Sequence, residues 1–95
     1  MAVTLEAVRR TDTGRGASRR LRRQERIPAI ILEPGKDSIS ISVDEKKLIL
    51  AALREEFIRG LDLSLDGRQI AVRPIAIQRH PVSSRIIHID FKVAA

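Results

Sequence analysis

A run of arginines near the N-terminus is the segment best suited to chemistry, and its residues are Gly14-Arg15-Gly16-Ala17-Ser18-Arg19-Arg20-Leu21-Arg22-Arg23. Guanidinium groups are planar and permanently charged, so they bind phosphates and base edges through paired hydrogen bonds. Neighbouring like charges repel each other, and only Asp12 and Glu25 are near enough in sequence to relieve that repulsion. The pattern favours a nucleic-acid backbone as partner, and a solvated basic helix face remains the alternative.

A second polar group lies near the C-terminus. His88 and Asp90 alternate with apolar residues, and Gln78-Arg79-His80 precedes them on what we expect to be a neighbouring strand. Together these side chains would offer donors and acceptors to base edges or ribose hydroxyls. A merely solvated polar pair is equally compatible with the residues alone.

The same residue types offer little for catalysis. The chain has two histidines and no cysteine, and it lacks both a Gly-x-Ser-x-Gly sequence and a phosphate-binding loop. A metal shared by His80, His88 and Asp90 would require three side chains to converge, which the sequence does not guarantee. We therefore expect a protein that is not an enzyme and that has no cofactor and no metal site.

The charge distribution supports the arginine-rich segment as a nucleic-acid-binding site. The formal net charge is +6, and residues 1–26 carry eight arginines against three acidic residues, whereas residues 27–95 are nearly balanced. Arginine outnumbers lysine 14 to 4, which favours bidentate contacts over diffuse attraction. The chain has no Trp or Tyr, and Phe57 and Phe91 fall among core-facing residues. Recognition of a folded or double-helical RNA therefore fits better than stacking on single-stranded bases.

Short alternating segments must position these residues. Period-2 hydrophobicity predicts strands, and Asp66-Gly67 indicates a two-residue hairpin. Pro74 should mark an edge or a bulge. Ile87, Ile89, Phe91 and Val93 should face the core, opposite Ile86, His88, Asp90 and Lys92. The predicted strands are residues 3–7, 29–33, 38–43, 61–65, one from Ile70 onward, and 85–93.

Two helices are predicted between these strands. The first covers residues 17–25 and should end because of Pro28. The second begins after Asp44 as N-cap and continues to about Phe57. Its predicted buried stripe consists of Ile49, Ala52, Leu53 and Phe57.

Six strands and two short helices make the chain mainly β (α+β), and we expect a small, closed or nearly closed six-stranded β-barrel in a single domain over residues 1–95. An open two-layer α+β sandwich is the structural alternative. No signal peptide is visible, and the apolar runs are far shorter than the roughly 20 residues that span a bilayer. These features favour a cytoplasmic protein without membrane contact.

The arginine-rich segment resembles the GKGASRRLR signature of the bacterial ribosomal L25 family, with Arg15 in place of Lys. Three further blocks resemble that family in the same order, and the resemblance spans essentially the whole chain. They are Ile27-Pro28-Ala29-Ile30-Ile31, Gln78-Arg79-His80-Pro81 and His88-Ile89-Asp90-Phe91. The resemblance implies a six-stranded barrel of the large ribosomal subunit that binds 5S rRNA at loop E, from the minor-groove side of a distorted helix.

The same resemblance implies which side chains contact RNA. They are Arg10, Arg15, Ser18, Arg19, Arg20, Gln78, Arg79, His88 and Asp90. Counting back from Gly14 selects Arg10 rather than Arg9, and strand alternation independently directs Arg10 outward. Leu32 departs from the family pattern, because many relatives have an RNA-contacting Tyr at this position. The chain resembles the short, single-domain form of the family, and we expect it to be a monomer when free.

Two other functions remain compatible with the residues. One is a free-standing regulator that binds another structured RNA or duplex DNA. The other is a protein-interaction barrel whose basic segment contacts an acidic partner. Sedimentation wholly apart from the large subunit in a lysate gradient would favour these over a ribosomal role.

Overall fold

The structure, a computed structural model, describes residues 3–10 and 15–94. Six strands form a closed barrel in the order β1-β3-β2-β6-β5-β4. The elements are β1 Thr4–Arg9, α1 Arg15–Arg23, β2 Arg26–Leu32, β3 Ile39–Asp44, α2 Glu45–Ala52, α3 Glu56–Arg59, β4 Leu61–Leu65, β5 Arg68–Arg79 and β6 Ile86–Val93. The predicted mainly β barrel is confirmed, with three short helices in the described part rather than two.

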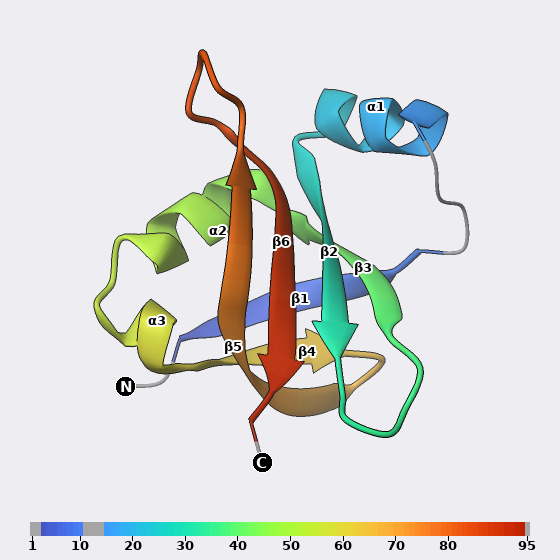
Figure 1. The fold of residues 1–95 in the computed structure, drawn as a ribbon, viewed down its shortest axis with the longest axis vertical. Coiled ribbons are helices and arrows are strands. Elements are labelled where there is room, and N and C mark those ends of the chain that lie inside the picture. The colour runs from blue at the N-terminus through green and yellow to red at the C-terminus, as the bar shows by residue number, and fades with distance from the viewer. Residues whose placement is uncertain (1–2, 11–14, 95) are drawn as a thin grey trace.

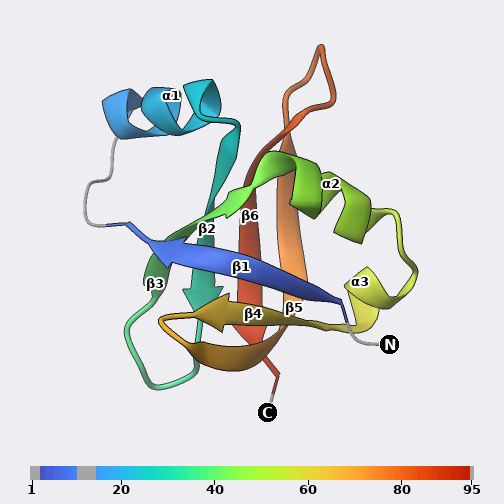
Figure 2. The ribbon, with the colours of Figure 1, turned by 180° about the vertical axis from the view of Figure 1, so that it is seen from behind.

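Closure of the barrel depends on two parallel pairs. β1 pairs with β4, and β2 pairs with β6, while the other neighbours are antiparallel. Going round the closed barrel, β6 is therefore diametrically opposite β1. Figure 1 shows β2, β6 and β5 toward the viewer, and Figure 2 shows β1, β4 and the helices α2 and α3 on the other side.

The interior is filled by the inward-facing side chains of all six strands, as the alternation predicts. Phe91 and Phe57 are both buried, which confirms that neither aromatic ring is available for base stacking. Asp66 and Gly67 both have positive φ angles between β4 and β5, as the predicted two-residue hairpin requires. Pro74 lies beside a register shift between β5 and β6, which confirms the predicted irregularity there.

The predicted helix boundaries need correction. α1 ends at Arg23, and the chain reverses through Glu25 at a φ of 58°. Pro28 does not end the helix, because it lies within β2. It is tolerated in that strand because its pairing with β6 begins only at Ala29, so no amide hydrogen is needed on that side.

The predicted buried stripe of the second helix is wrong at two positions. Asp44 does cap α2, since its Oδ1 accepts a hydrogen bond from the backbone N–H of Lys47 at 3.1 Å. The helix buries Leu48 and Ala51, whereas Ile49 and Leu53 are exposed. α2 ends at Ala52, and Phe57 reaches the core from the separate helix α3. The predicted stripe requires one uninterrupted helix that continues to Phe57. Because the helix breaks after Ala52, α2 packs against the core with a different face, which carries Leu48 and Ala51.

The last strand departs from simple alternation at its start. Ile89 and Phe91 face the core as predicted, but Ile86 is also buried although alternation directs it outward. The register shifts between Gln78, which pairs with His88, and Arg79, which pairs with Ile86. One extra residue in β6 at this point allows Ile86 to turn inward.

Candidate RNA-binding surface

The strands β3, β2, β6 and β5 present a continuous surface on the side of the barrel away from its core, which we call the outer face. Its side chains alternate with buried ones along each strand, and cross-strand pairing sets them in rows. One row joins Ile30, Asp90 and Ala76, and the next joins Leu32, Lys92 and Arg73. The outer face comprises Pro28, Ile30, Leu32, Ser40, Ser42, Arg73, Ala76, Gln78, His88, Asp90 and Lys92.

Three of the side chains that are predicted to contact RNA lie together on this face. His88 Nε2 and Asp90 Oδ1 are 2.7 Å apart, and both side chains are half-buried. Gln78 pairs directly with His88 across β5 and β6. In the tautomer with its hydrogen on Nε2, His88 donates to Asp90 Oδ1, which leaves the second Asp90 oxygen and, in that neutral ring, Nδ1 as acceptors. This arrangement can receive ribose hydroxyls or the amino groups of bases.

The helix α1 borders the outer face where β2 begins. Pro28 and Ser42 are buried although they belong to this face, and α1 contacts β2. Arg26 also covers Ser42, since its Nε donates to Ser42 Oγ and its Nη2 to the Ser42 carbonyl, both at 2.9 Å. Pro28 directly precedes the Ala29–Ile89 pair, so this edge lies next to His88. Figure 1 shows α1 across the end at which β2 begins and β5 ends.

α1 therefore carries its arginines to the edge of the outer face. Arg19 and Arg20 are exposed, and Leu21 is the half-buried residue beneath them. Three arginines lie in the last turn, where cations are favoured by the helix dipole. The backbone of Arg15 and Ser18 belongs to α1, but their side chains lie outside the described part of the structure. Their predicted contacts remain predictions.

Arg10 continues the same surface from the end of β1. Its backbone N–H donates to the Ser40 carbonyl at 2.9 Å, which aligns it with the row of Ile30 and Asp90. The side chain is half-buried, and its Nη2 atom is shielded from solvent. No described residue accepts a hydrogen bond from that atom. A shielded guanidinium nitrogen without an acceptor is costly, so an external acceptor would relieve it.

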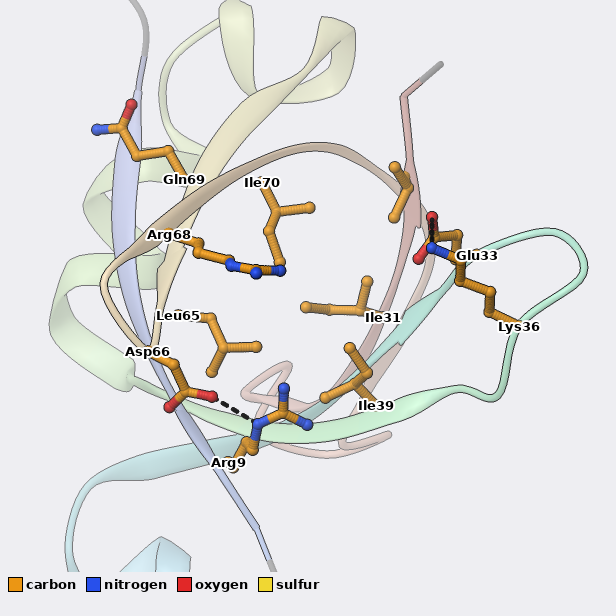
Figure 3. A pocket seen from close by; sticks show the side chains of 11 residues that line it. Arg9, Ile31, Glu33, Lys36, Ile39, Leu65, Asp66, Arg68, Gln69 and Ile70 are labelled. Carbon is orange, nitrogen blue, oxygen red and sulfur yellow. Dashed lines mark hydrogen bonds and ion pairs between the residues drawn. The ribbon is translucent and has the colours of Figure 1, made fainter.

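The adjacent Arg9 belongs to a different site. It lies at one mouth of the barrel, where its Nε contacts Asp66 Oδ2 at 2.6 Å. This mouth holds a cavity of about 580 Å³. Figure 3 shows its lining, in which the charged Arg9, Asp66 and Arg68 lie beside apolar side chains such as Ile31 and Leu65. Strand alternation thus separates two neighbouring arginines, so that Arg10 adjoins the outer face and Arg9 lies at the barrel mouth. The RNA contact expected of Arg10 stays a prediction.

Arg79 is not brought onto the outer face. It is adjacent to Gln78 and so points to the other side of β5, where its Nη1 donates to the Ser84 carbonyl at 3.2 Å. It lines a groove with Ile49 and Leu53 of α2. His80 is occupied locally, since its Nδ1 accepts from the backbone N–H groups of Val82 and Ser83.

A group of polar contacts that the sequence patterns missed joins the turn after α1, the helix α2 and the β5–β6 connection. We call it the α2 junction, and it consists of Glu25, Glu45, Lys46 and Arg85. Arg85 binds both carboxylate oxygens of Glu45, and the Glu45 N–H donates to the Glu25 carbonyl at 2.9 Å. Lys46 contacts Glu25 at 3.9 Å. The hydrogen bond to Glu45, and then the charge of that carboxylate, raises the pKa of Arg85 above its ordinary value. Residues 40 positions apart form this pair, so no local motif announces it.

The described residues contain no cluster of three or more His, Cys, Asp or Glu side chains able to hold a metal ion. None of the described helices combines the length and apolar composition that a bilayer crossing requires. What the surface offers is a set of cations beside polar acceptors, which suits binding of an anionic, hydrogen-bonding polymer.

Comparisons with known proteins identify the family of the chain. Residues 5–91 match the Ribosomal L25p family. The large ribosomal subunit protein bL25 of Aeromonas salmonicida is 46% identical over 92 residues, which cover 96% of this chain and 97% of the relative. The protein of the same name from Tolumonas auensis is 41% identical with the same coverage. The chain belongs to the Ribosomal L25p family.

Proposed function

We propose that this protein is a structural component of the large ribosomal subunit that binds 5S rRNA at its loop E region. Two relatives with more than 40% identity are named as large ribosomal subunit proteins, and they align over nearly the full chain. The four sequence blocks that resemble the family carry the expectation of 5S rRNA and loop E. The protein would act in the cytoplasm as part of the ribosome, as a single-domain monomer before assembly.

One observation carries the proposal: the barrel brings α1 and the His88–Asp90 pair to one side of the molecule, and Arg10 lies at the β1 end of the cross-strand row that contains Asp90. Cations border a polar centre. The cations can bind the phosphates of an RNA backbone, and the polar side chains can form hydrogen bonds to the groups displayed between its two strands. The two aromatic rings are buried, so splayed bases have no platform on which to stack. The wide minor groove of an RNA helix displays ribose hydroxyls and base edges that such a surface can reach.

The side chains proposed to contact RNA divide into two kinds. Arg10, Arg15, Arg19 and Arg20 would contact phosphates, with Ser18 as a hydroxyl donor. Gln78, His88 and Asp90 would contact ribose hydroxyls or base edges through the acceptors left free by the His88–Asp90 hydrogen bond. Arg79 lies on the other side of β5 and would reach RNA only beyond the edge of the outer face.

Titration of isolated 5S rRNA against a variant RNA tests this proposal. In the variant, loop E is replaced by a regular Watson–Crick helix of equal length. The intact RNA should bind on the order of 1,000-fold more tightly, as specific nucleic-acid sites do over non-specific ones. Equal affinity for both RNAs would reject loop E, and tighter binding to another structured RNA would favour a free-standing regulator.

A further inference from the structure

Two cations face each other on the outer face without a carboxylate between them. Lys92 on β6 pairs directly with Arg73 on β5, and both strands are antiparallel at this point. Side chains directly opposite in such a pair are close enough to interact, and like charges there destabilise the sheet. Among the described residues, neither side chain takes part in an ion pair or a side-chain hydrogen bond.

The residue that pairs with Lys92 on its other side offers it no acceptor. Leu32 is the partner of Lys92 on its other side, and this leucine is 38% exposed. The row is thus an exposed apolar side chain followed by two unpaired cations. Natural sequences are locally consistent except where function requires otherwise, so a row of this kind marks a binding site.

The row also continues the surface already described. Lys92 is two residues from Asp90 on the same strand, so the two side chains share the outer face and are about 7 Å apart. Arg73 extends the row onto β5. Leu32 and Lys92 lie near the ends of β2 and β6, whereas α1 precedes the start of β2. An RNA backbone held by α1 at one end of the outer face would leave that face over these two cations.

We propose that Lys92 and Arg73 form a second phosphate-binding site, which takes the RNA backbone at the end of the outer face opposite to α1. The inference rests on the proposed function and extends it by two residues that the sequence motifs did not include. Leu32 has no polar group to offer RNA, so in this row the attraction would come from the charge of its neighbour Lys92. An acidic protein segment is the competing partner for the same two cations.

Salt-dependent titration of 5S rRNA with Lys92→Ala, Arg73→Ala and the double variant tests the proposal. Each phosphate interaction that is removed should reduce the slope of log affinity against log salt by about one unit. At 0.1 M salt, that slope corresponds to roughly 5- to 10-fold weaker binding for each variant. The double variant should lose about two units of slope.

Lys47→Ala is the matched control. Lys47 is an exposed lysine of α2 that lies near the start of β1, on the side of the barrel opposite β6. It should leave the slope unchanged. Lys92→Glu adds a second readout, because it would pair with Arg73 and leave the melting temperature equal or slightly higher while it weakens RNA binding more than Lys92→Ala does.

The outcomes separate the two proposals. If the wild-type protein binds 5S rRNA and the double variant keeps the full salt slope, the second phosphate site is wrong and the proposed function stands. The double variant could instead keep its full binding to 5S rRNA and lose binding to an acidic ribosomal protein that the wild-type protein binds. That result would assign the two cations to the acidic partner. If the wild-type protein does not bind 5S rRNA, both proposals are overturned.

Discussion

The α2 junction and the outer face use charge in opposite ways. At the junction each cation contacts a carboxylate of the protein itself, as Arg85 does with Glu45 and Lys46 with Glu25. On the outer face Lys92 faces Arg73, and the adjoining Arg10 has a shielded nitrogen without an acceptor among the described residues. The two regions are separated by only a few residues of β6 and the connection before it.

This difference indicates which charges serve the fold and which serve a partner. Ion pairs within the chain are complete in the free protein, so their loss should appear in stability. Cations without internal partners add little to stability and have their electrostatic energy available for an external anion. Substitutions at the junction should therefore change the melting temperature, and substitutions on the outer face should change RNA affinity.

The largest effect is expected from Arg10→Ala. Its shielded guanidinium would form charge-assisted hydrogen bonds to RNA, and losing such bonds costs about 1.5–3 kcal/mol, or roughly 10- to 150-fold in affinity. The melting temperature of the free protein should not fall, since Nη2 has no described acceptor to lose. The neighbouring Arg9→Ala is the control, because Arg9 pairs with Asp66 at the barrel mouth. Similar losses of affinity in both variants would contradict the separation of the two arginines.

Substitution of His88 or Asp90 by alanine should have a comparable or slightly smaller effect. Either change removes one member of the 2.7 Å pair and leaves an RNA polar group unsatisfied, at about 1–3 kcal/mol. Binding should weaken roughly 5- to 150-fold at fixed salt, with the salt slope nearly unchanged because every phosphate interaction is kept. Loss of the half-buried His88–Asp90 hydrogen bond should lower the melting temperature only slightly, because both side chains lie on the outer face and not in the core. A large fall in melting temperature would make the pair structural.

The exposed arginines of α1 should produce a smaller effect of a different kind. Arg19 and Arg20 are adjacent and so differ in direction by about 100° around the helix, which means that at least one should meet phosphate. The alanine variant of that arginine should lose about one unit of salt slope and bind all RNAs more weakly. Unchanged slopes for both variants would show that the helix presents only a solvated face.

The smallest effect on RNA binding is expected from Glu45→Gln at the α2 junction. The substitution removes the carboxylate that Arg85 contacts through two nitrogens, so thermal unfolding should begin at a lower temperature. The outer face keeps all of its side chains, and affinity should change less than in any variant above. Calorimetry and RNA titration on the same sample measure both quantities. A loss of affinity equal to that of His88→Ala would join the two regions into one functional unit.

The barrel was predictable because its strands are short and alternate clearly. Leu61, Leu63 and Leu65 are all buried, and the hairpin at Asp66-Gly67 follows directly from turn chemistry. Prediction fails where alternation or helical spacing is carried across an interruption. Ile86 turns inward at a register shift, and the helix expected to reach Phe57 divides after Ala52.

The candidate site was predictable to the extent that its residues lie in motifs. The arginine segment and the His88–Asp90 strand are visible in the sequence, and the barrel places them on one side. The opposition of Lys92 and Arg73 depends on strand register across residues far apart in the chain. The same is true of Arg26 with Ser42, so these residues could be found only from the fold.

Chemical footprinting of isolated 5S rRNA, with and without the protein, tests the central claim most directly. A complex through the outer face should protect the backbone and ribose groups of loop E on the minor-groove side. The protection should extend in two directions, toward the RNA segments held by α1 and by Lys92 with Arg73. It should weaken in the Asp90→Ala variant at the same protein concentration. Protection elsewhere on the RNA, or none at saturating protein, would contradict the assignment of the outer face as the 5S rRNA-binding surface.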